Sequence, residues 1–390
     1  GAQAGSAKGP APPRSTPNRL TSKSSGNTVD ELDMASAAAP SEAGSPSFGS
    51  AGDKVWPEER YRVICTIGEG CFGTVVLAES QVHGQRVALK CVKPDAGREV
   101  HEVELMKTIQ HPNVVPLLDC FEALGKDGQK SLHIVMEYLP QNLHERIAGR
   151  PMGPVDLRCF GFQMLRALAH LDGMSICHRD LKPENILLGT DRVLKLCDFG
   201  SAKVLKDGPS SSYICARWWR APELVLGCQN YGTSTDWWSG GCVIAEMMRG
   251  RPLLPGTSSW GQMLEIVTQL GPPTEAEVRA LTKKTSDEKM VKDLADLMLS
   301  SSGRGLAKPW EELLPTYASM PEAIELVGSL LRYDPATRRA PAEALCARFF
   351  RPLEEDTNSL PPRIFEFTVE ELRACKPESR QELRALAQKC

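Results

Sequence analysis

Hydrophobic and polar residues change their spacing part-way along the chain. In the first patterned region, short β-branched runs separated by glycine-containing turns predict three strands, at residues 61–66, 74–77 and 86–92. Tyr61, Val63 and Cys65 alternate with their neighbours, which predicts that the first strand is half-buried. Because the connections are short, we expect an antiparallel sheet.

A helix should follow the third strand. Residues 98–109 have helical spacing, with Glu102, Met106 and Ile109 on one stripe. A buried strand is expected after this helix, at residues 132–139. This part of the chain is therefore expected to form a small β-rich lobe, which a linker near residues 137–141 ends.

Beyond the linker the pattern is mainly helical. Long buried helices are expected at residues 157–171 and 234–250, and Thr235 or Asp236 is placed to cap the start of the second helix. The predicted fold class is therefore α+β, with a small antiparallel β-rich N-lobe and a larger mainly helical C-lobe. The expected parts are a tail at 1–55, a catalytic region at 61–350 made of an N-lobe at 61–139 and a C-lobe at 140–350, and a C-terminal extension at 351–390 that packs on the lobes.

Composition adds to this picture. Residues 1–55 are rich in Ala, Gly, Ser and Pro, and such a segment cannot bury enough apolar surface to order itself, so we expect disorder. The net charge of −3 argues against a nucleic-acid partner, and no apolar run is long enough to predict a membrane span. The 13 cysteines are scattered and form no C-x-x-C pair, which argues against a zinc knuckle or redox pair. Reduced thiols favour an intracellular protein, in the cytoplasm or the nucleus.

The stretch GEGCFGTV, at residues 68–75, has glycines in G-x-G-x-x-G-x-V order. Glycine lets backbone N–H groups approach phosphates without obstruction by side chains. A dinucleotide-binding loop should open a helix, whereas here a strand follows. The pattern therefore favours a flap folded over phosphates, with an ordinary tight hairpin as the alternative.

A lysine lies on the otherwise apolar third strand. Lys90 shares a face with Ala88, and a buried lysine needs a carboxylate partner. Glu102 lies on the inner stripe of the next helix and needs a cation, so pairing the two explains both. Glu99 and Glu104 are alternative partners, and a solvated edge position is the alternative for the lysine.

The stretch ICHRDLKPENILL places several polar side chains directly before an apolar run. Phosphoryl transfer needs a carboxylate that receives a hydroxyl proton, a cation near the moving phosphoryl group and an oxygen ligand for Mg²⁺. Asp180, Lys182 and Asn185 have these properties, and Asp198 in LKLCDFG offers a second metal ligand. A plain loop between a helix and a strand is the alternative.

In this order, the glycine-rich flap, VALK, the helix glutamate, HRDLKPEN, DFG and APE resemble the protein kinases over about residues 61–350. Within them, CHRD, KLCDFGSAK and SYICARWWRAPEL resemble the glycogen synthase kinase-3 family of the CMGC group. So does IFEFTVEEL, at residues 364–372, which lies beyond the catalytic lobes. Cyclin-dependent and mitogen-activated kinases share stretches like RWWRAPE but lack that last element.

The resemblance implies the two-lobed protein kinase fold with a site for ATP and Mg²⁺. Lys90, paired with Glu102, would hold the α- and β-phosphates. Backbone groups of Glu137 and Leu139 would bind adenine, and Met136 would gate the back pocket. The other residues expected at the nucleotide are Ile67, Gly68, Glu69, Gly70, Cys71, Phe72, Gly73, Thr74, Val75 and Ala88.

The resemblance also implies catalytic roles. Asp180 would be the catalytic base, with Lys182 beside it, and Asn185 and Asp198 would bind magnesium. Structural roles are implied for Asp236 below the catalytic loop and for Arg338 paired with Glu223.

Tyr213 lies between three serines and a bulky basic stretch, in GPSSSYICARWWRAPE. A phosphate on Tyr213 would add charge and acceptor oxygens, which Arg217 and Arg220 are placed to bind. The resemblance implies that this tyrosine is autophosphorylated and that the loop then orders. A packed aromatic residue without a switch is the alternative. Trp218 and Trp219 are expected to pack, and one of them to wall a pocket for a proline after the target residue.

The sequence departs from the family at two places. The resemblance implies three basic residues that bind a phosphate carried by the substrate four residues beyond the target. Arg179 and Lys203 match two of them, but His101 stands at the third position, where Arg98 on the same helix face is a possible replacement. Residues 283–310 correspond to the family's scaffold-docking groove but are longer and match it poorly.

The expected function is that of an ATP-dependent serine/threonine protein kinase that acts on proteins, with a preference for substrates already carrying phosphate. One alternative is a proline-directed CMGC kinase without this requirement. A kinase-like scaffold without catalysis is a more remote alternative. The presence of Lys90, Asp180, Asn185 and Asp198 favours the enzyme, because a scaffold would not need all four.

Overall fold

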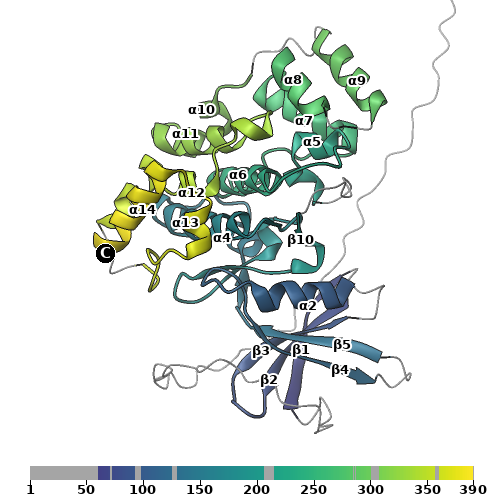
Figure 1. Cartoon of the computed structure of the whole chain (residues 1–390), viewed down its shortest axis with the longest axis vertical. Coiled ribbons are helices and arrows are strands. Elements are labelled where there is room, and N and C mark those ends of the chain that lie inside the picture. The colour runs from purple at the N-terminus through teal and green to yellow at the C-terminus, as the bar shows by residue number, and fades with distance from the viewer. Residues whose placement is uncertain are drawn as a thin grey trace, which may run out of the picture. The chain divides into compact units, whose positions relative to one another are not determined.

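A computed structural model describes most of the chain beyond residue 59. The described residues are 60–70, 73–92, 98–124, 130–205, 215–283, 285, 287–299, 307–355 and 360–389, and all belong to the unit of residues 55–390. Figure 1 shows a β-sheet at one end of this unit and a mainly helical part at the other. The predicted α+β class with two lobes is therefore confirmed. None of the helices within the described ranges is both long and apolar enough to span a membrane.

The N-lobe is a five-stranded antiparallel sheet with one helix beside it (Figure 1). The strands lie in the order β1-β2-β3-β5-β4. Glu102, Met106 and Ile109 are all buried, so the predicted stripe of the helix faces inward. The elements are β1 (Tyr61–Gly70), β2 (Gly73–Ser80), β3 (Arg86–Val92), α2 (Arg98–Thr108), β4 (Leu117–Leu124) and β5 (Lys130–Glu137).

Both edges of this sheet differ from the sequence prediction. β1 was predicted to be half-buried, but Val63 and Ile64 are 58% and 48% exposed. It forms one edge of the described sheet, and its register with β2 shifts after Val63, so no regular face is covered. β4 forms the other edge and was not predicted, because Asp119 and Glu122 interrupt its apolar run.

The C-lobe is built around two long helices, α4 (Pro154–Gly173) and α6 (Ser234–Arg249). In α4, residues 159–171 are all buried. A Cβ atom on Gly240 of α6 would lie only 2.9 Å from Leu168 of α4, so glycine allows the two helices to approach closely. The other helices are α3 (Leu143–Ile147), α5 (Pro222–Val225), α7 (Ser259–Leu270), α8 (Glu275–Thr282), α9 (Glu288–Leu299), α10 (Trp310–Leu313), α11 (Pro321–Leu330) and α12 (Pro341–Ala344).

Short strands and 3₁₀ helices connect these helices. The strands form two small antiparallel sheets, one of β10 and β7 and the other in the order β6-β8-β9. The strands are β6 (Gln141–Asn142), β7 (Ile176–Cys177), β8 (Ile186–Leu188), β9 (Leu194–Leu196) and β10 (Lys203–Val204). The 3₁₀ helices are η1 (Pro183–Asn185), η2 (Phe199–Ser201), η3 (Arg217–Trp219), η4 (Pro315–Tyr317), η5 (Pro335–Thr337) and η6 (Arg348–Glu354).

The predicted cap of α6 was wrong. The N-cap residue is Thr233, which makes no side-chain cap bond, and both Thr235 and Asp236 lie inside the first turn. The Asp236 carboxylate instead accepts the backbone N–H groups of His178 and Arg179, at 2.6 and 3.0 Å. A residue that could cap its own helix thus supports a loop that lies far away in the sequence.

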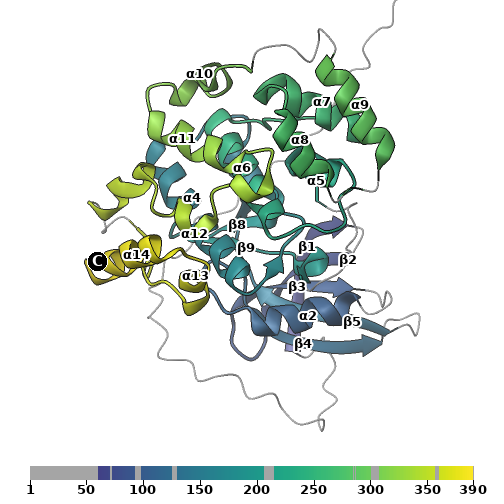
Figure 2. The ribbon, with the colours of Figure 1, turned by 45° about the horizontal axis from the view of Figure 1, so that its top comes forward.

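The described part of the C-terminal extension, residues 360–389, contains α13 (Val369–Arg373) and α14 (Pro377–Lys389). Figures 1 and 2 show these two helices beside α4 and α12. α13 packs on α4, and Lys376 pairs with Glu343 of α12 at 2.8 Å. The extension therefore continues the packing of the C-lobe.

One ion pair lies deep in the C-lobe. Arg338 donates two hydrogen bonds to the carboxylate of Glu223, both at 2.6 Å, and the two side chains are 0% and 4% exposed. The guanidinium also lies over the Trp238 ring, 5.2 Å from its centroid. Because both charges are shielded from water, each depends on the other.

We expect Arg338→Met to lower the free energy of unfolding by about 3–5 kcal/mol, because it leaves the Glu223 charge buried without a partner. Urea denaturation measures this change. Arg332→Met is the control, since Arg332 is exposed, and should change the free energy by no more than about 0.5 kcal/mol. A loss for Arg338→Met as small as that of the control would contradict the prediction.

Candidate active site

A cleft of about 800 Å³ lies between the sheet and the helical lobe, and its walls hold most of the residues predicted at a nucleotide. Those that line it are Ile67, Gly68, Glu69, Gly73, Val75, Ala88, Lys90, Met136, Glu137 and Leu139. Thr74 is half-buried in β2 and is not among them, and Gly70 ends β1. Cys71 and Phe72 lie outside the described residues. The cleft thus joins residues of the flap, β3 and the linker, as the sequence predicted.

At the inner end of the cleft, one ammonium group contacts two carboxylates. Lys90 Nζ lies 2.8 Å from Glu102 Oε1 and 2.9 Å from Asp198 Oδ1. Burial alone would lower the pKa of Lys90, but Asp198 and Glu102 outweigh it and raise that pKa above its ordinary value. The pKa of Asp198 is lowered, because Lys90 outweighs the effect of burial. The pairing of Lys90 with Glu102 is the one that the apolar stripe predicted.

A second cluster surrounds Asp180. Its Oδ2 atom accepts hydrogen bonds from Lys182 Nζ at 2.8 Å and from Asn185 Nδ2 at 3.0 Å. Its Oδ1 atom accepts the backbone N–H of Ala216 at 3.1 Å. These donors fix the carboxylate while its side chain stays 16% exposed. The carboxylate, the ammonium and the amide expected to act together are therefore in direct contact.

The oxygen atoms around Asp198 suit a magnesium ion. Asp198 has a left-handed backbone conformation, with φ 63°, which is uncommon for a residue other than glycine and occurs often at functional sites. Within the described part of the chain, neither its Oδ2 atom nor the Oδ1 atom of Asn185 has a hydrogen-bond partner. Mg²⁺ prefers oxygen ligands, and in phosphate-transfer sites it takes one or two from the protein and the others from phosphates and water. Two uncommitted oxygens of this kind fit such a site.

The sequence also matches known proteins. Residues 61–350 match the family model described as protein kinase domain. The chain belongs to the protein kinase family. Glycogen synthase kinase 3 of Trypanosoma brucei brucei (strain 927/4 GUTat10.1) is 37% identical over 358 residues, which cover 86% of this chain and 97% of that protein. The chain is thus a protein serine/threonine kinase that resembles glycogen synthase kinase 3, as its motifs predicted.

The segment after residue 214 of this kinase is anchored to the C-lobe. Arg217 donates to the Thr257 carbonyl at 3.0 Å, and Arg220 donates to the Cys215 carbonyl at 2.8 Å. Tyr213 lies outside the described residues, so its phosphorylation stays a prediction. Both tryptophans of this segment line the cleft. They differ in exposure, because Trp218 is 40% exposed and Trp219 only 6%.

The three residues predicted to bind a substrate phosphate lie on neighbouring elements. Lys203 of β10 pairs with Cys177 of β7, in the strand just before Arg179. Arg179 donates to the Ser201 carbonyl of η2 at 2.5 Å, and α2, which carries the exposed His101, packs against η2. The side chains of Arg98 and Glu99 lie outside the described part of the structure.

Residues 283–310, which correspond to the docking groove of the resembling kinases but match it poorly, include α9. Thr285 forms a β-bridge with Cys228, and its hydroxyl donates to the Leu226 carbonyl. Leu294 of α9 is fully buried. Residues 284, 286 and 300–306 lie outside the described residues, so the poor match to the family's docking groove is not tested.

Two functional contacts were missed by the sequence analysis. Lys195 of β9 pairs with Glu137 at 2.5 Å and so ties the linker to the C-lobe. Glu246 of α6 is 2% exposed and accepts a hydrogen bond from the Trp219 indole at 2.9 Å. Burial raises the pKa of Glu246 to about 7, although the Trp219 hydrogen bond opposes the shift. A glutamate inside an otherwise apolar helix was the available signal for the second contact.

We expect Glu246→Gln to stabilise the kinase at pH 8 but not near pH 4.5. The folded-state pKa of about 7 lies above the ordinary value of 4.5, so the folded state binds the proton more tightly. The free energy of unfolding therefore falls as the pH rises between these values and stays low above them. Glutamine keeps an acceptor for Trp219 without this titration, and its advantage at pH 8 should reach about 3 kcal/mol.

Thermal unfolding between about pH 4.5 and pH 8 measures this difference. Glu325→Gln is the control, because Glu325 is exposed, and it should follow the wild type at every pH. An advantage of Glu246→Gln that did not grow with pH would disprove the raised pKa.

Proposed function

We propose that this kinase transfers the γ-phosphoryl group of ATP, bound with Mg²⁺ in the cleft, to serine or threonine hydroxyls of proteins. The observation that carries the proposal is the arrangement of two clusters at one cleft. One joins Lys90 to Glu102 and Asp198, and the other joins Asp180 to Lys182. Such an arrangement supplies both phosphate binding and hydroxyl activation.

The first cluster binds and orients the nucleotide. Lys90 holds the α- and β-phosphates, and Glu102 fixes the position of the Lys90 ammonium group in the cleft. Asp198 and Asn185 would hold a Mg²⁺ ion, which would offset negative charge on the phosphates. The backbone of residues 67–70 and 73–75 would cover the phosphates, and backbone groups of Glu137 and Leu139 would bind adenine.

The second cluster acts on the substrate. Asp180 receives the hydroxyl proton, and the Lys182 ammonium lies beside it, 2.8 Å away, as the cation near the moving phosphoryl group. The Ala216 N–H orients the same carboxylate toward the peptide-binding segment. The complete set of polar groups argues against a scaffold without catalysis, since a scaffold needs none of these contacts.

We expect Asp180→Asn to bind ATP normally but to lower kcat by about 10²–10⁴-fold, because the hydroxyl proton loses its acceptor. Asp198→Asn should lose magnesium-dependent ATP binding as well as turnover, because it removes a charged metal ligand. Transfer of the labelled γ-phosphate to a peptide measures turnover, and calorimetric titration measures ATP binding.

Asp191→Asn is the matched control, because Asp191 is exposed in the turn between β8 and β9. It should keep both properties. Near-normal turnover by Asp180→Asn would exclude its role as base, and a wild-type protein without turnover would contradict the proposed function.

We further propose a preference for substrates that already carry a phosphate four residues beyond the target. Arg179 and Lys203 supply two basic groups for this phosphate, and His101 supplies the third only when its ring is protonated. A bound phosphate favours the protonated ring. The replacement of a guanidinium by an exposed imidazole at position 101 favours the alternative, a proline-directed kinase without this preference.

We therefore expect the ratio of kcat/KM for a phosphorylated peptide to that for its unphosphorylated form to increase as the pH falls from about 8 to about 6. His101→Arg should raise the ratio and remove its pH dependence, because the guanidinium stays charged. Gln110→Arg adds the same charge just after α2 and serves as the control. A ratio near one at every pH, unchanged by His101→Arg, would favour the unprimed alternative.

A further inference from the structure

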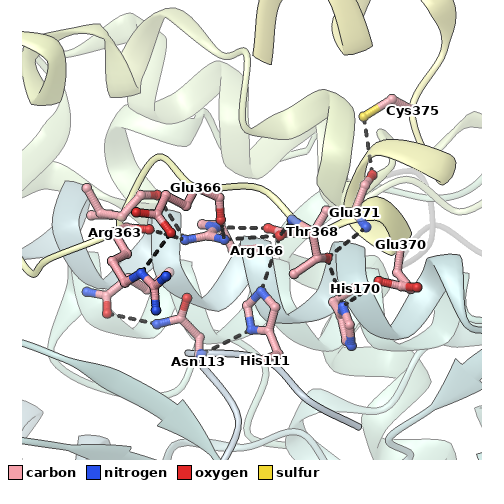
Figure 3. Close-up of polar contacts among 12 residues, drawn as sticks. His111, Asn113, Arg166, His170, Arg363, Glu366, Thr368, Glu370, Glu371 and Cys375 are labelled. Carbon is pink, nitrogen blue, oxygen red and sulfur yellow. Dashed lines mark hydrogen bonds and ion pairs between the residues drawn. The ribbon is translucent and has the colours of Figure 1, made fainter. Parts of the chain in front are cut away.

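The C-terminal extension closes around one buried arginine of α4 (Figure 3). Nε and Nη2 of Arg166 donate to the two carboxylate oxygens of Glu371, at 2.8 and 3.0 Å. The remaining N–H groups donate to the backbone carbonyls of Arg363 and Ile364, both at 3.0 Å, and of Glu366. The side chains of Arg166 and Glu371 are 1% and 0% exposed. The extension therefore satisfies the whole guanidinium group.

Glu371 also has partners other than Arg166. Its Oε2 atom accepts the backbone N–H of Thr368 at 2.5 Å, which completes the capping box of α13. The same oxygen lies 3.4 Å from Nε2 of His111. Burial would raise the pKa of Glu371, but His111 and Arg166 outweigh it and lower that pKa to about 2. The carboxylate is therefore charged at neutral pH.

His111 belongs to the other lobe, on the loop between α2 and β4. The backbone N–H of Asn113 donates to its Nδ1 atom at 3.0 Å, which leaves the proton of the neutral ring on Nε2, the nitrogen that faces Glu371. The His111 side chain is 0% exposed, and its ring centroid lies 4.8 Å from that of His170. Figure 3 shows His111 directed at the start of α13. Nε2 of His111 thus lies 3.4 Å from a buried carboxylate of the extension, close enough to pack against it but without the geometry of a hydrogen bond.

The loop that carries His111 is connected to the two elements that bear the carboxylates holding Lys90. It begins where α2, the helix of Glu102, ends. It then runs beside β9, because Leu196 donates to the Asn113 carbonyl and accepts from the Val115 N–H, both at 2.9 Å. β9 leads directly into the segment with the second carboxylate. One loop therefore connects the extension to both sides of the active-site ion cluster.

We propose that Glu371 is a positioning residue for phosphoryl transfer, which acts through His111 on the loop that orients Glu102 and Asp198. This role rests on the proposed function. The contact with Glu371 anchors the His111 ring, and with it the loop, to the extension. A shift of the loop reaches both carboxylates, and catalysis is sensitive to misplacements of about 1 Å. The extension thus helps to position the residues of the active site.

Glu371→Gln and His111→Phe test the link, because each removes it from one side. Glutamine still completes the capping box, and phenylalanine still fills the space of the imidazole. We expect each variant to lower kcat about tenfold, a usual size for coupling between separate sites, with a smaller change in the KM of the peptide. Because both remove the same contact, the double variant should be no slower than either single variant.

Two controls separate the link from general destabilisation. Glu370→Gln makes the same chemical change at the neighbouring position, where the side chain is 31% exposed, and should change kcat by no more than about twofold. Arg158→Met removes a hydrogen bond from α4 to the Phe349 carbonyl, on a side chain that does not reach the loop. It should lower the melting temperature while leaving kcat near that of the wild type.

Hydrogen exchange of the α2 amides supplies a readout that needs no turnover. These amides should exchange faster in Glu371→Gln and His111→Phe than in either control. If the wild type shows no turnover, the proposed function fails. Hydrogen exchange of the α2 amides still tests whether the contact between Glu371 and His111 stabilises α2. Additive losses of kcat in the double variant, or α2 exchange equal to that of Arg158→Met, would overturn the proposal. Should Glu371→Gln fail to fold, the kcat and α2 exchange of His111→Phe decide it.

Discussion

The active site depends on one buried ammonium group that two carboxylates share across the cleft. Lys90 in β3 contacts Glu102 on α2 at 2.8 Å and Asp198, which follows β9, at 2.9 Å. A buried charge is tolerated only where partners compensate it. This cluster therefore constrains the sheet, the helix beside it and a segment of the C-lobe at the same time. The lobes have to meet in one arrangement for the charge to be satisfied, and that arrangement forms the cleft.

Below the cleft, the C-lobe holds strained backbone in place through buried polar groups. Arg179 and Asp198 both have left-handed conformations, with φ of 67° and 63°. Such conformations cost free energy and persist only where the surrounding structure determines them. Asp236 supplies part of that support, because it is 2% exposed and accepts the N–H groups of His178 and Arg179. The tightly packed α6 thus serves the loop above it as a rigid base.

The sequence predicted those features that local pattern determines. β3 and the inward stripe of α2 follow from periodicity, and two opposite charges on apolar faces predicted that Lys90 pairs with Glu102. The exposure of β1 could not be predicted, because alternation shows which residues share a face but not whether another layer covers it. The flap and the linker also followed from local pattern, whereas the roles proposed for the metal ligands depend on the motifs of the kinase family. The contact of Asp180 with the backbone of Ala216 needed the fold, because no side-chain pattern signals it.

The C-terminal extension was recognised by resemblance, but only the structure gives a physical reason for its presence. The guanidinium of Arg166 is buried in α4, and all of its hydrogen bonds go to the extension. These acceptors compensate a charge that is shielded from water, and removing one partner of such a buried pair commonly costs about 3–5 kcal/mol. Residues 61–350 hold every residue proposed to act in catalysis, but the extension supplies the acceptors of this buried guanidinium group. The extension and the C-lobe should fold together, since each buries polar groups that the other satisfies.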